Sequence, residues 1–198
     1  MATVSSSQLV SVGDYLAGEL VSQTKHEFLG GVIYAMAGGR NVHNLISTNI
    51  TGSLHANLRG KPCQPYNSDT KIRIHLSTHV RFYYPDVSVI SDPNSPDDSF
   101  QDQPALVVEV LSRSTRRTDE GEKKDAYLTI PSLKVYLLVK QEAPVVTVYR
   151  RDEQGGFVRE VYEGMETVLS LPEIETELPL TEIYEGVKFS PEPDVELR

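Results

Sequence analysis

A run of strand-forming residues in the middle of the chain contains a single carboxylate. In QPALVVEVLS, residues 103–112, alanine, leucine and valine follow one another almost without a break, apart from Glu109. A run of this kind predicts a strand that is buried on both faces. An ionised carboxylate is costly in such a strand unless it is paired or bound to a metal. Glu109 therefore needs a partner.

Hydrophobic periodicity divides the rest of the chain into short helices and strands. Apolar residues four apart over residues 42–58 predict an amphipathic helix, and Gly30-Gly31 predicts the turn of a hairpin within residues 25–38. Further helices are predicted over residues 7–20, 116–130 and 180–186. Further strands are predicted over residues 71–76, 80–90, 105–111, 134–139, 145–151 and 156–164.

This order of elements indicates the α/β fold class. Strands lie on both sides of a helix in the sequence, so we expect a mixed central β-sheet flanked by helices, with its middle strands buried on both sides. The 198 residues are enough for one domain with a sizeable core, which we expect to span residues 1–189. The final residues, 190–198, are expected to form a loose C-terminal tail.

Composition indicates an ordinary soluble protein, because 39% of the residues are hydrophobic and 24% are charged. The single Cys63 excludes an intrachain disulfide and a metal cluster built from cysteines. The first 20 residues lack the basic leader and apolar core of a signal peptide, and no window approaches the length of a membrane helix. We therefore expect a cytoplasmic protein with no membrane partner.

The net charge of −9 is confined to one end of the chain. Residues 151–198 hold 4 Lys and Arg against 13 Asp and Glu, whereas residues 1–150 hold 15 of each. A solvated face explains most of this acidity. Because the first 150 residues are neutral overall, the net charge does not exclude nucleic acid as a partner.

Three further charged residues stand at unusual positions. Asp86 follows Pro85, which lacks an N–H group and marks a bulge or a strand start. Lys123 shares the apolar face of the predicted 116–130 helix, although its stem could carry the ammonium outward. Glu27 comes just before the predicted hairpin turn. Each position also has an ordinary structural explanation, as a turn residue, a surface lysine and an exposed strand end.

Together with Glu109, these residues form a candidate metal-dependent site. Asp86 and Glu109, on neighbouring buried strands, could converge on a hard divalent cation such as Mg²⁺ or Mn²⁺. The ion would pair the carboxylates and polarise a phosphate oxygen or a bound water. Lys123 would position that water or stabilise the charge that develops on the phosphorus centre. Glu27 could hold a second ion or an outer water.

Five cations follow the predicted strand within twelve residues. They are Arg113, Arg116, Arg117, Lys123 and Lys124. Such a cluster suits the phosphates of a nucleic-acid backbone, which Arg and Lys contact most often. A solvated helix start is the alternative, because neighbouring acids, Asp119 among them, partly cancel the charge.

Several of these segments resemble the Uma2 family, also called DUF820. The likeness lies in HEFLGGVIYAMAG, RFYYPDVSVISD and VTVYRR, and above all in the block from Val107 to Tyr127, whose spacing VVEVLSxST…DxGEKxxxY is specific. The family is assigned to the PD-(D/E)XK nuclease superfamily. The resemblance therefore implies a restriction endonuclease-like fold and a metal-dependent endonuclease that hydrolyses phosphodiester bonds of DNA. A homodimer would be consistent with such a fold.

The resemblance also implies roles for the candidate residues. Pro85-Asp86 corresponds to the PD of the superfamily and Glu109 to its second acid, while Leu111 stands where the usual lysine would be. The matching lysine is Lys123 on the following helix, with Tyr127 as a supporting residue. Glu27 matches an early acidic residue, yet family members often read DGE where this chain has Gly30, Gly31 and Val32.

Two alternatives to a nuclease remain at this point. One is a catalytically inactive nuclease-fold module that binds nucleic acid or a protein partner, which the loss of acids at the Gly30-Gly31 turn favours. The other treats Glu109 as a structural residue in a buried ion pair with an arginine such as Arg73. The relative positions of Asp86, Glu109 and Lys123 distinguish these possibilities.

Overall fold

The computed structural model describes residues 9–112 and 116–189. Its helical segments are α1 (Val12–Glu19), α2 (Asn41–Asn57), α3 (Arg116–Thr118), the π-helical η1 (Asp119–Lys123), α4 (Lys124–Tyr127), the 3-10 helix η2 (Pro172–Ile174) and α5 (Leu180–Ile183). Its strands are β1 (His26–Leu29), β2 (Val32–Ala35), β3 (Gln64–Asn67), β4 (Lys71–His75), β5 (Val80–Tyr83), β6 (Val87–Ile90), β7 (Phe100–Gln101), β8 (Pro104–Leu111), β9 (Val135–Lys140), β10 (Val145–Arg151), β11 (Phe157–Glu163), β12 (Val168–Leu171) and β13 (Thr176–Pro179).

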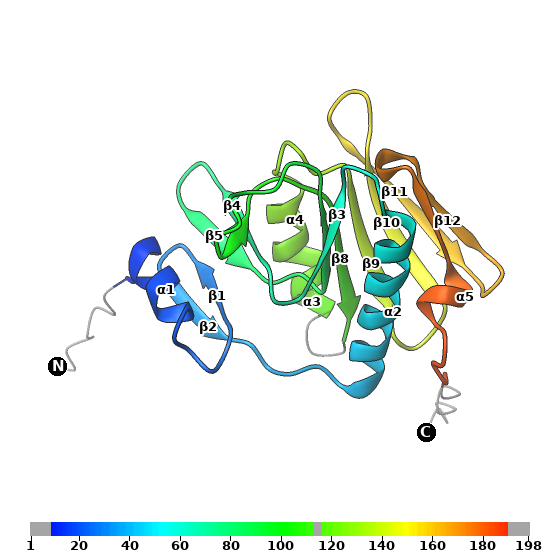
Figure 1. The fold of residues 1–198 in the computed structure, drawn as a ribbon, viewed down its shortest axis with the longest axis horizontal. Coiled ribbons are helices and arrows are strands. Elements are labelled where there is room, and N and C mark those ends of the chain that lie inside the picture. Colours follow the sequence, from blue (N-terminus) through cyan, green and yellow to red (C-terminus); the bar gives the residue numbers. More distant parts are fainter. Residues whose placement is uncertain (1–8, 113–115, 190–198) are drawn as a thin grey trace, which may run out of the picture.

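The strands form two main sheets, of which the six-stranded one is the predicted mixed central sheet. A five-stranded sheet has the order β2-β1-β5-β4-β7, and a six-stranded sheet has the order β11-β10-β9-β8-β6-β3. The six-stranded sheet is mixed, because β8 and β9 run parallel while its other neighbours run antiparallel. A two-stranded ribbon of β12 and β13 accompanies them. The predicted α/β class, with mixed sheets flanked by helices, is thus confirmed (Figure 1).

Pro85 marks the point at which the chain passes from one sheet to the other. The predicted strand over residues 80–90 is in fact two strands, β5 in the five-stranded sheet and β6 in the six-stranded sheet. Pro85 lies between them and cannot donate a ladder hydrogen bond. The chain therefore leaves one sheet after Tyr83 and enters the other at Val87. Asp86 immediately precedes β6 at this crossing.

The predicted hairpin is confirmed, with β1 and β2 paired from His26↔Ala35 to Leu29↔Val32. Gly30 and Gly31 make the turn with φ values of 59° and 101°. Positive φ is accessible to glycine at little cost but strains other residues. The hairpin forms the edge of the five-stranded sheet, with α1 next to it (Figure 1).

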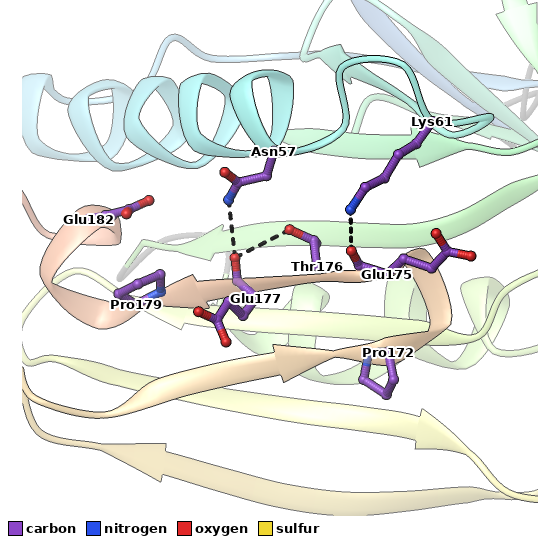
Figure 2. A pocket seen from close by; sticks show the side chains of 8 residues that line it. All are labelled: Asn57, Lys61, Pro172, Glu175, Thr176, Glu177, Pro179 and Glu182. Carbon is purple, nitrogen blue, oxygen red and sulfur yellow. Dashed lines mark hydrogen bonds between the residues drawn. The ribbon is translucent and has the colours of Figure 1, made fainter.

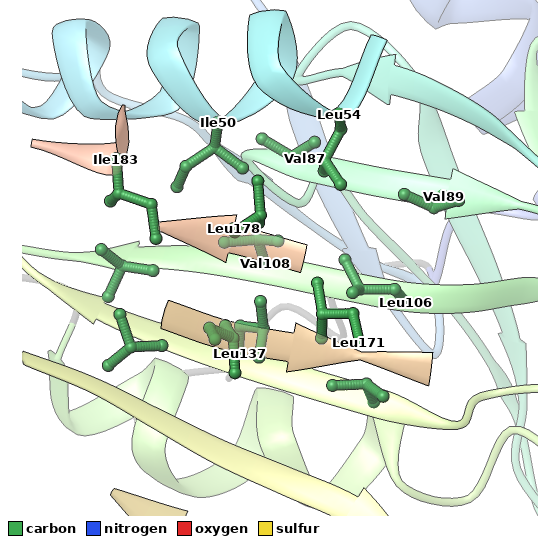
Figure 3. Close-up of a cluster of buried hydrophobic side chains, with 14 of the residues drawn as sticks. Ile50, Leu54, Val87, Val89, Leu106, Val108, Leu137, Leu171, Leu178 and Ile183 are labelled. Carbon is green, nitrogen blue, oxygen red and sulfur yellow. The ribbon is translucent and has the colours of Figure 1, made fainter. Parts of the chain in front are cut away.

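The buried side chains gather on the two faces of the six-stranded sheet. On one face, α2, α5 and the β12–β13 ribbon pack against alternate residues of β6, β8 and β9 (Figure 3). On the other face, α4 packs over the remaining residues of β8 and β9 and over β4. The alternation in β8 is clear, because Leu106 and Val108 face α2 whereas Val107 and Leu111 face α4. The strand is therefore buried on both faces, as its sequence predicts.

The predicted helix over residues 116–130 is interrupted. Gly121 has φ −113° and ψ −106°, which lies outside the helical region, and the chain forms α3, a π-helical segment and α4 in turn. Glycine permits this backbone because it lacks a side chain. The shorter α4 still presents Ala126 and Tyr127 to the sheet, both buried.

The packing of α2 predicts how its apolar residues affect stability. Leu54 is 0% exposed in the core against the six-stranded sheet, whereas Leu45 on the same helix is 38% exposed. Leu54→Ala should lower the free energy of unfolding by about 2–5 kcal/mol because it leaves a cavity. Leu45→Ala, the matched control, should change it by less than about 1 kcal/mol. Urea unfolding followed by circular dichroism measures both, and equal losses would contradict this packing.

Candidate active site

Glu109 lies on the face of β8 that is turned toward α4. It takes the position between Val107 and Leu111 and is 4% exposed. Tyr127 and Tyr136 line the same side of the sheet, with ring centroids 5.5 Å apart. Burial raises the pKa of the Glu109 carboxyl well above its ordinary value; the Lys123 charge opposes this, and the charges of nearby acids add to it. The predicted burial of this carboxylate is confirmed.

Lys123 is the partner that Glu109 requires. The Lys123 Nζ lies 3.7 Å from Glu109 Oε1, 2.7 Å from Glu27 Oε1 and 3.6 Å from Asp119 Oδ1. We call these four residues the lysine cluster. They come from β1, β8 and the π-helical segment, so the cluster joins both sheets through one ammonium group.

The surroundings keep the Lys123 ammonium charged. Its side chain is 9% exposed, and burial alone would lower its pKa. The negative charges of Glu109, Glu27 and Asp119 outweigh burial and raise the pKa above its ordinary value. The Nζ also lies 5.4 Å from the centroid of the Tyr83 ring, a favourable cation–π arrangement. A lysine held in this form cannot act as a proton acceptor near neutral pH.

Asp86 is held from two sides next to the cluster. Its Oδ2 accepts a hydrogen bond of 2.7 Å from the Val110 backbone N–H, and its Oδ1 lies 2.8 Å from His43 Nε2. Strand β6 pairs with β8 from Val87↔Val108, and Asp86 lies just before β6. Asp86 is close enough for its charge to raise the Glu109 pKa. Glu109 thus lies in β8, whereas Asp86 lies next to the neighbouring strand rather than within it.

His43 completes this arrangement from the first turn of α2. Its Nδ1 is 3.4 Å from Gln141 Nε2, which also donates to the Leu111 carbonyl at 2.8 Å. Burial lowers the pKa of His43, but the hydrogen bond and charge of Asp86 outweigh it, so the pKa is raised overall. The imidazole fixes the orientation of the Asp86 carboxylate.

The balance of charge around Glu109 is negative. Three carboxylates surround the Lys123 ammonium, and Asp86 adds a fourth carboxylate nearby. Glu109 Oε1 accepts no hydrogen bond from the described residues. Among residues 9–112 and 116–189, no group of three or more His, Cys, Asp or Glu side chains has the arrangement of a metal site. Two carboxylates with hard oxygen donors nevertheless suffice for Mg²⁺, which takes its other ligands from water and substrate.

A family profile described as "Putative restriction endonuclease", named Uma2, matches residues 12–181 of the chain. The chain belongs to the Uma2 family. The match includes every residue of the lysine cluster, and also Asp86 and His43. The resemblance that the sequence motifs indicate is thus confirmed.

Two cyanobacterial relatives and one solved structure are similar to this Uma2 chain. "Uncharacterized protein slr1290" from Synechocystis sp. is 36% identical over 181 residues, which cover 91% of this chain and 94% of the relative. "Uncharacterized protein sll1609" from the same organism is 30% identical over 154 residues, covering 76% of this chain and 86% of the relative.

The solved structure is the crystal structure of "a putative nuclease belonging to DUF820" from Anabaena variabilis. It has a TM-score of 0.65 and 15% identity, and the match covers 82% of this chain and 90% of that one. At this level of identity the likeness concerns the fold, which is therefore that of a DUF820 protein.

Arg73 is not the partner of Glu109. Its Nε and Nη2 each lie 2.7 Å from an oxygen of Asp102, in a bidentate ion pair that Asn94 Nδ2 extends at 2.9 Å. The guanidinium also covers the Phe100 ring, 4.2 Å from its centroid. The alternative in which Glu109 pairs with Arg73 is therefore wrong.

The basic residues predicted to contact a nucleic-acid backbone are only partly described. Arg113 and the side chain of Arg117 lie outside the described part of the structure. Arg116 Nη2 pairs with Glu142 at 3.0 Å, with 40% of its side chain exposed. Lys124 Nζ lies 3.4 Å from Asp125 Oδ1. A role in backbone contact stays a prediction for these residues.

Sequence reasoning missed two residues of this region. His43 lies one helical turn before the buried Ile46, on the apolar stripe of α2, and that spacing could have indicated that it is directed inward. Asp119 was counted among acids of a solvated helix start, yet it is 2% exposed. Its spacing of four residues from Lys123 is the signal that could have placed it.

A hollow of about 510 Å³ lies elsewhere, between the C-terminal end of α2 and β13 (Figure 2). Lys61 Nζ donates to the Glu175 carbonyl, and Asn57 Nδ2 donates to the Glu177 carbonyl at 3.3 Å. These contacts attach α2 to the β12–β13 ribbon. The hollow contains no residue of the lysine cluster, so its polar groups serve the fold.

No helix within the described part of the chain is long and apolar enough to span a membrane.

Replacing Lys123 should reveal how strongly its ammonium stabilises the fold. Lys123→Met leaves three buried carboxylates without a counter-charge, and breaking a buried pair in this way costs about 3–5 kcal/mol. Lys124→Met is the control, because the ion pair of this neighbouring lysine within the described residues is with the largely exposed Asp125, and its other contact is with the Tyr149 ring at 5.3 Å. It should cost less than about 1 kcal/mol. Chemical denaturation at pH 7 compares the two, and a mild Lys123→Met variant would contradict a charged cluster.

The Arg73–Asp102 pair should make stability depend on acid pH. Burial raises the pKa of Asp102, but hydrogen bonds from Arg73 and Asn94 outweigh it, so the pKa falls below the ordinary 3.8. A depressed pKa means that the stabilisation is present above about pH 3.8 and is lost as the pH falls through the lower folded value.

Asp102→Asn should therefore be less stable than the natural chain by about 1 kcal/mol at pH 7, and the difference should shrink below about pH 3.8. Urea unfolding between pH 3 and pH 7 measures this difference. Asp97→Asn changes an exposed acid of the same connecting segment and should show none. A constant difference for Asp102→Asn across the range would contradict the assignment.

Proposed function

We propose that this Uma2 protein is a metal-dependent endonuclease that hydrolyses phosphodiester bonds of DNA, with Mg²⁺ or Mn²⁺ as its cofactor. The observation that carries the proposal is that Asp86, held by the backbone N–H of Val110 on β8, lies near Glu109, which in turn lies beside the Lys123 ammonium. Membership of a family described as "Putative restriction endonuclease" supports it. The buried Glu109 Oε1, which accepts no hydrogen bond from the described residues, also supports a cation at this position.

Asp86 and Glu109 would be the protein ligands of the cation. When bound, the cation would polarise a phosphate oxygen and lower the pKa of a bound water. The Val110 N–H and His43 fix the Asp86 carboxylate before any substrate arrives. This preorganisation spares the site a rearrangement during the reaction.

Lys123 serves as an electrostatic residue in this proposal. Its raised pKa rules out general-base catalysis at neutral pH, so the ammonium instead stabilises negative charge that develops on the attacked phosphate. Glu27 lies closest to Lys123 Nζ and orients it. Asp119 restrains the same group from the π-helical segment. Glu27 thus acts on the reaction through Lys123. This role does not depend on the acids that other family members carry at the hairpin turn, where this chain has Gly30, Gly31 and Val32.

A catalytically inactive module that binds nucleic acid is the second candidate, and one observation favours it. The side chains of Lys123 and Glu109 are only 9% and 5% exposed, so little of the cluster is open to a substrate. Asp86 and Glu27, each 15% exposed, are the more accessible acids. A binding module would show salt-dependent affinity for DNA without cleavage.

Nicking of supercoiled plasmid DNA tests the proposal. The purified chain should cleave with millimolar Mg²⁺ or Mn²⁺ and not with EDTA. Asp86→Asn keeps the shape of the side chain but removes a ligand charge, and it should reduce the rate by about 10²-fold or more. Asp102→Asn, which removes a carboxylate from an ion pair outside the cluster, should leave the rate within about twofold.

Two outcomes would contradict a metal-dependent nuclease. One is cleavage that persists in EDTA. The other is an Asp86→Asn variant that cleaves as fast as the natural chain. Salt-dependent DNA binding without cleavage under every metal condition would select the inactive binding module instead.

A further inference from the structure

Lys71 is a buried cation without an anionic partner. It is the first residue of β4 and is 5% exposed. Within the described residues, its ammonium makes no ion pair within 4 Å, and its Nζ lies 5.2 Å from the centroid of the Tyr84 ring. Burial lowers its pKa, while the charge of Glu19 acts in the opposite direction from beyond ion-pair distance. A buried charge of this kind destabilises a fold unless it is compensated.

Lys25 contacts the same aromatic ring as Lys71, but unlike Lys71 it has an acidic partner. Lys25 Nζ and Lys71 Nζ lie 5.5 Å and 5.2 Å from the centroid of the Tyr84 ring. Lys25 is paired with Asp69 at 2.6 Å and also donates to a backbone carbonyl. Two ammonium groups near one ring repel each other. The cation–π contact alone therefore does not compensate the Lys71 charge.

Lys71 also lines a cavity of about 580 Å³ between the β3–β4 segment and residues 93–101. The size lies within the usual range for small-molecule sites. Its far wall is anchored, because Asn94 N–H donates to Gln101 Oε1 at 2.8 Å and Asn94 Nδ2 holds Asp102. The cavity is thus formed by a connecting segment that is held in place.

The lining combines an ammonium group with hydroxyls and aromatic rings. Thr70 and Ser95 supply hydroxyl groups, and Tyr66 and Phe100 supply rings. Two acids also line the cavity. Asp69 is neutralised by Lys25, and Asp98 is exposed to solvent. Lysine is a common point-charge ligand of phosphate, and aromatic rings stack on nucleobases.

We propose that this cavity binds a nucleotide, with the Lys71 ammonium as the counter-charge of its phosphate group. The anion site rests on Lys71, whereas the choice of a nucleotide rests on the proposed nuclease function. Tyr84, against which Lys71 packs, is separated from Asp86 by Pro85 alone. Lys71 thus contacts the segment that leads directly to Asp86.

Binding in EDTA, where metal-dependent cleavage is prevented, tests the proposal independently of nuclease activity. Deoxyadenosine monophosphate should bind in a calorimetric titration, and deoxyadenosine without its phosphate should bind at least tenfold more weakly. A fluorescent single-stranded oligonucleotide should bind in an anisotropy titration. Lys71→Gln and Lys71→Met should weaken binding of at least one phosphate-bearing probe by tenfold or more.

Lys25→Gln is the matched control, because this lysine contacts the same ring but already has an acidic partner. It should change affinity by less than about threefold. Thermal unfolding distinguishes a binding role from a structural one. Removal of an uncompensated buried charge by Lys71→Met should leave the melting temperature unchanged or raise it by about 2–4 °C. A lower melting temperature with unchanged binding would overturn the proposal.

The probes also identify the source of the phosphate. Loss of oligonucleotide binding in the Lys71 variants supports a nucleotide within the substrate strand, and loss of mononucleotide binding alone supports a free nucleotide. Unchanged binding of both probes, or no binding of either by the natural chain, overturns the proposal even if the chain cleaves DNA. Conversely, if the chain does not cleave DNA but binds the probes through Lys71, the proposed nucleotide site is supported and the proposed nuclease function is contradicted.

Discussion

The buried ammonium group of Lys123 is the interaction on which the centre of this molecule depends. A carboxylate inside a strand that is covered on both faces would be unstable by itself, and so would a lysine under the same helix. Together with Glu27 and Asp119 they stabilise one another. Because these residues come from different sheets and from the segment between α3 and α4, the ion pairs also fix how the elements lie against each other.

This arrangement explains why charge, rather than apolar packing alone, organises the region. Apolar packing against β8 alone would allow the covering helix to lie in several positions. The position that it takes brings the Lys123 ammonium to three acids. The kink at Gly121 sets that placement, since a regular helix would direct Asp119 and Lys123 differently. Asp86 then lies at the margin of the cluster, oriented by a backbone N–H and by His43. The proposed chemistry uses both the fixed cluster and this more accessible acid.

Much of this could be predicted from the sequence, because local signals were strong where burial is complete. The strand around Glu109, the hairpin at Gly30-Gly31 and the helix α2 follow from hydrophobic pattern and turn residues. Pro85 was a recognisable interruption, yet no local signal shows that the strands on either side enter different sheets. That division depends on long-range pairing of β5 with β1 and β4. His43 and Asp119 were missed for another reason, since their helical spacing indicated an inward direction but not the partners that tertiary contacts bring to them.

The connection at Pro85 has a mechanical consequence. Tyr84, Pro85 and Asp86 are the segment that passes from the five-stranded sheet to the six-stranded one, and β1 of the first sheet carries Glu27 to a helix that covers the second. The candidate site therefore lies at the contact between the two sheets, and its residues come from both sides of that contact. A small sliding of one sheet past the other would separate Asp86, Glu27 and Lys123 while leaving the strands of both sheets paired. The geometry of the candidate site therefore depends on the contact between the two sheets as well as on the strands within each.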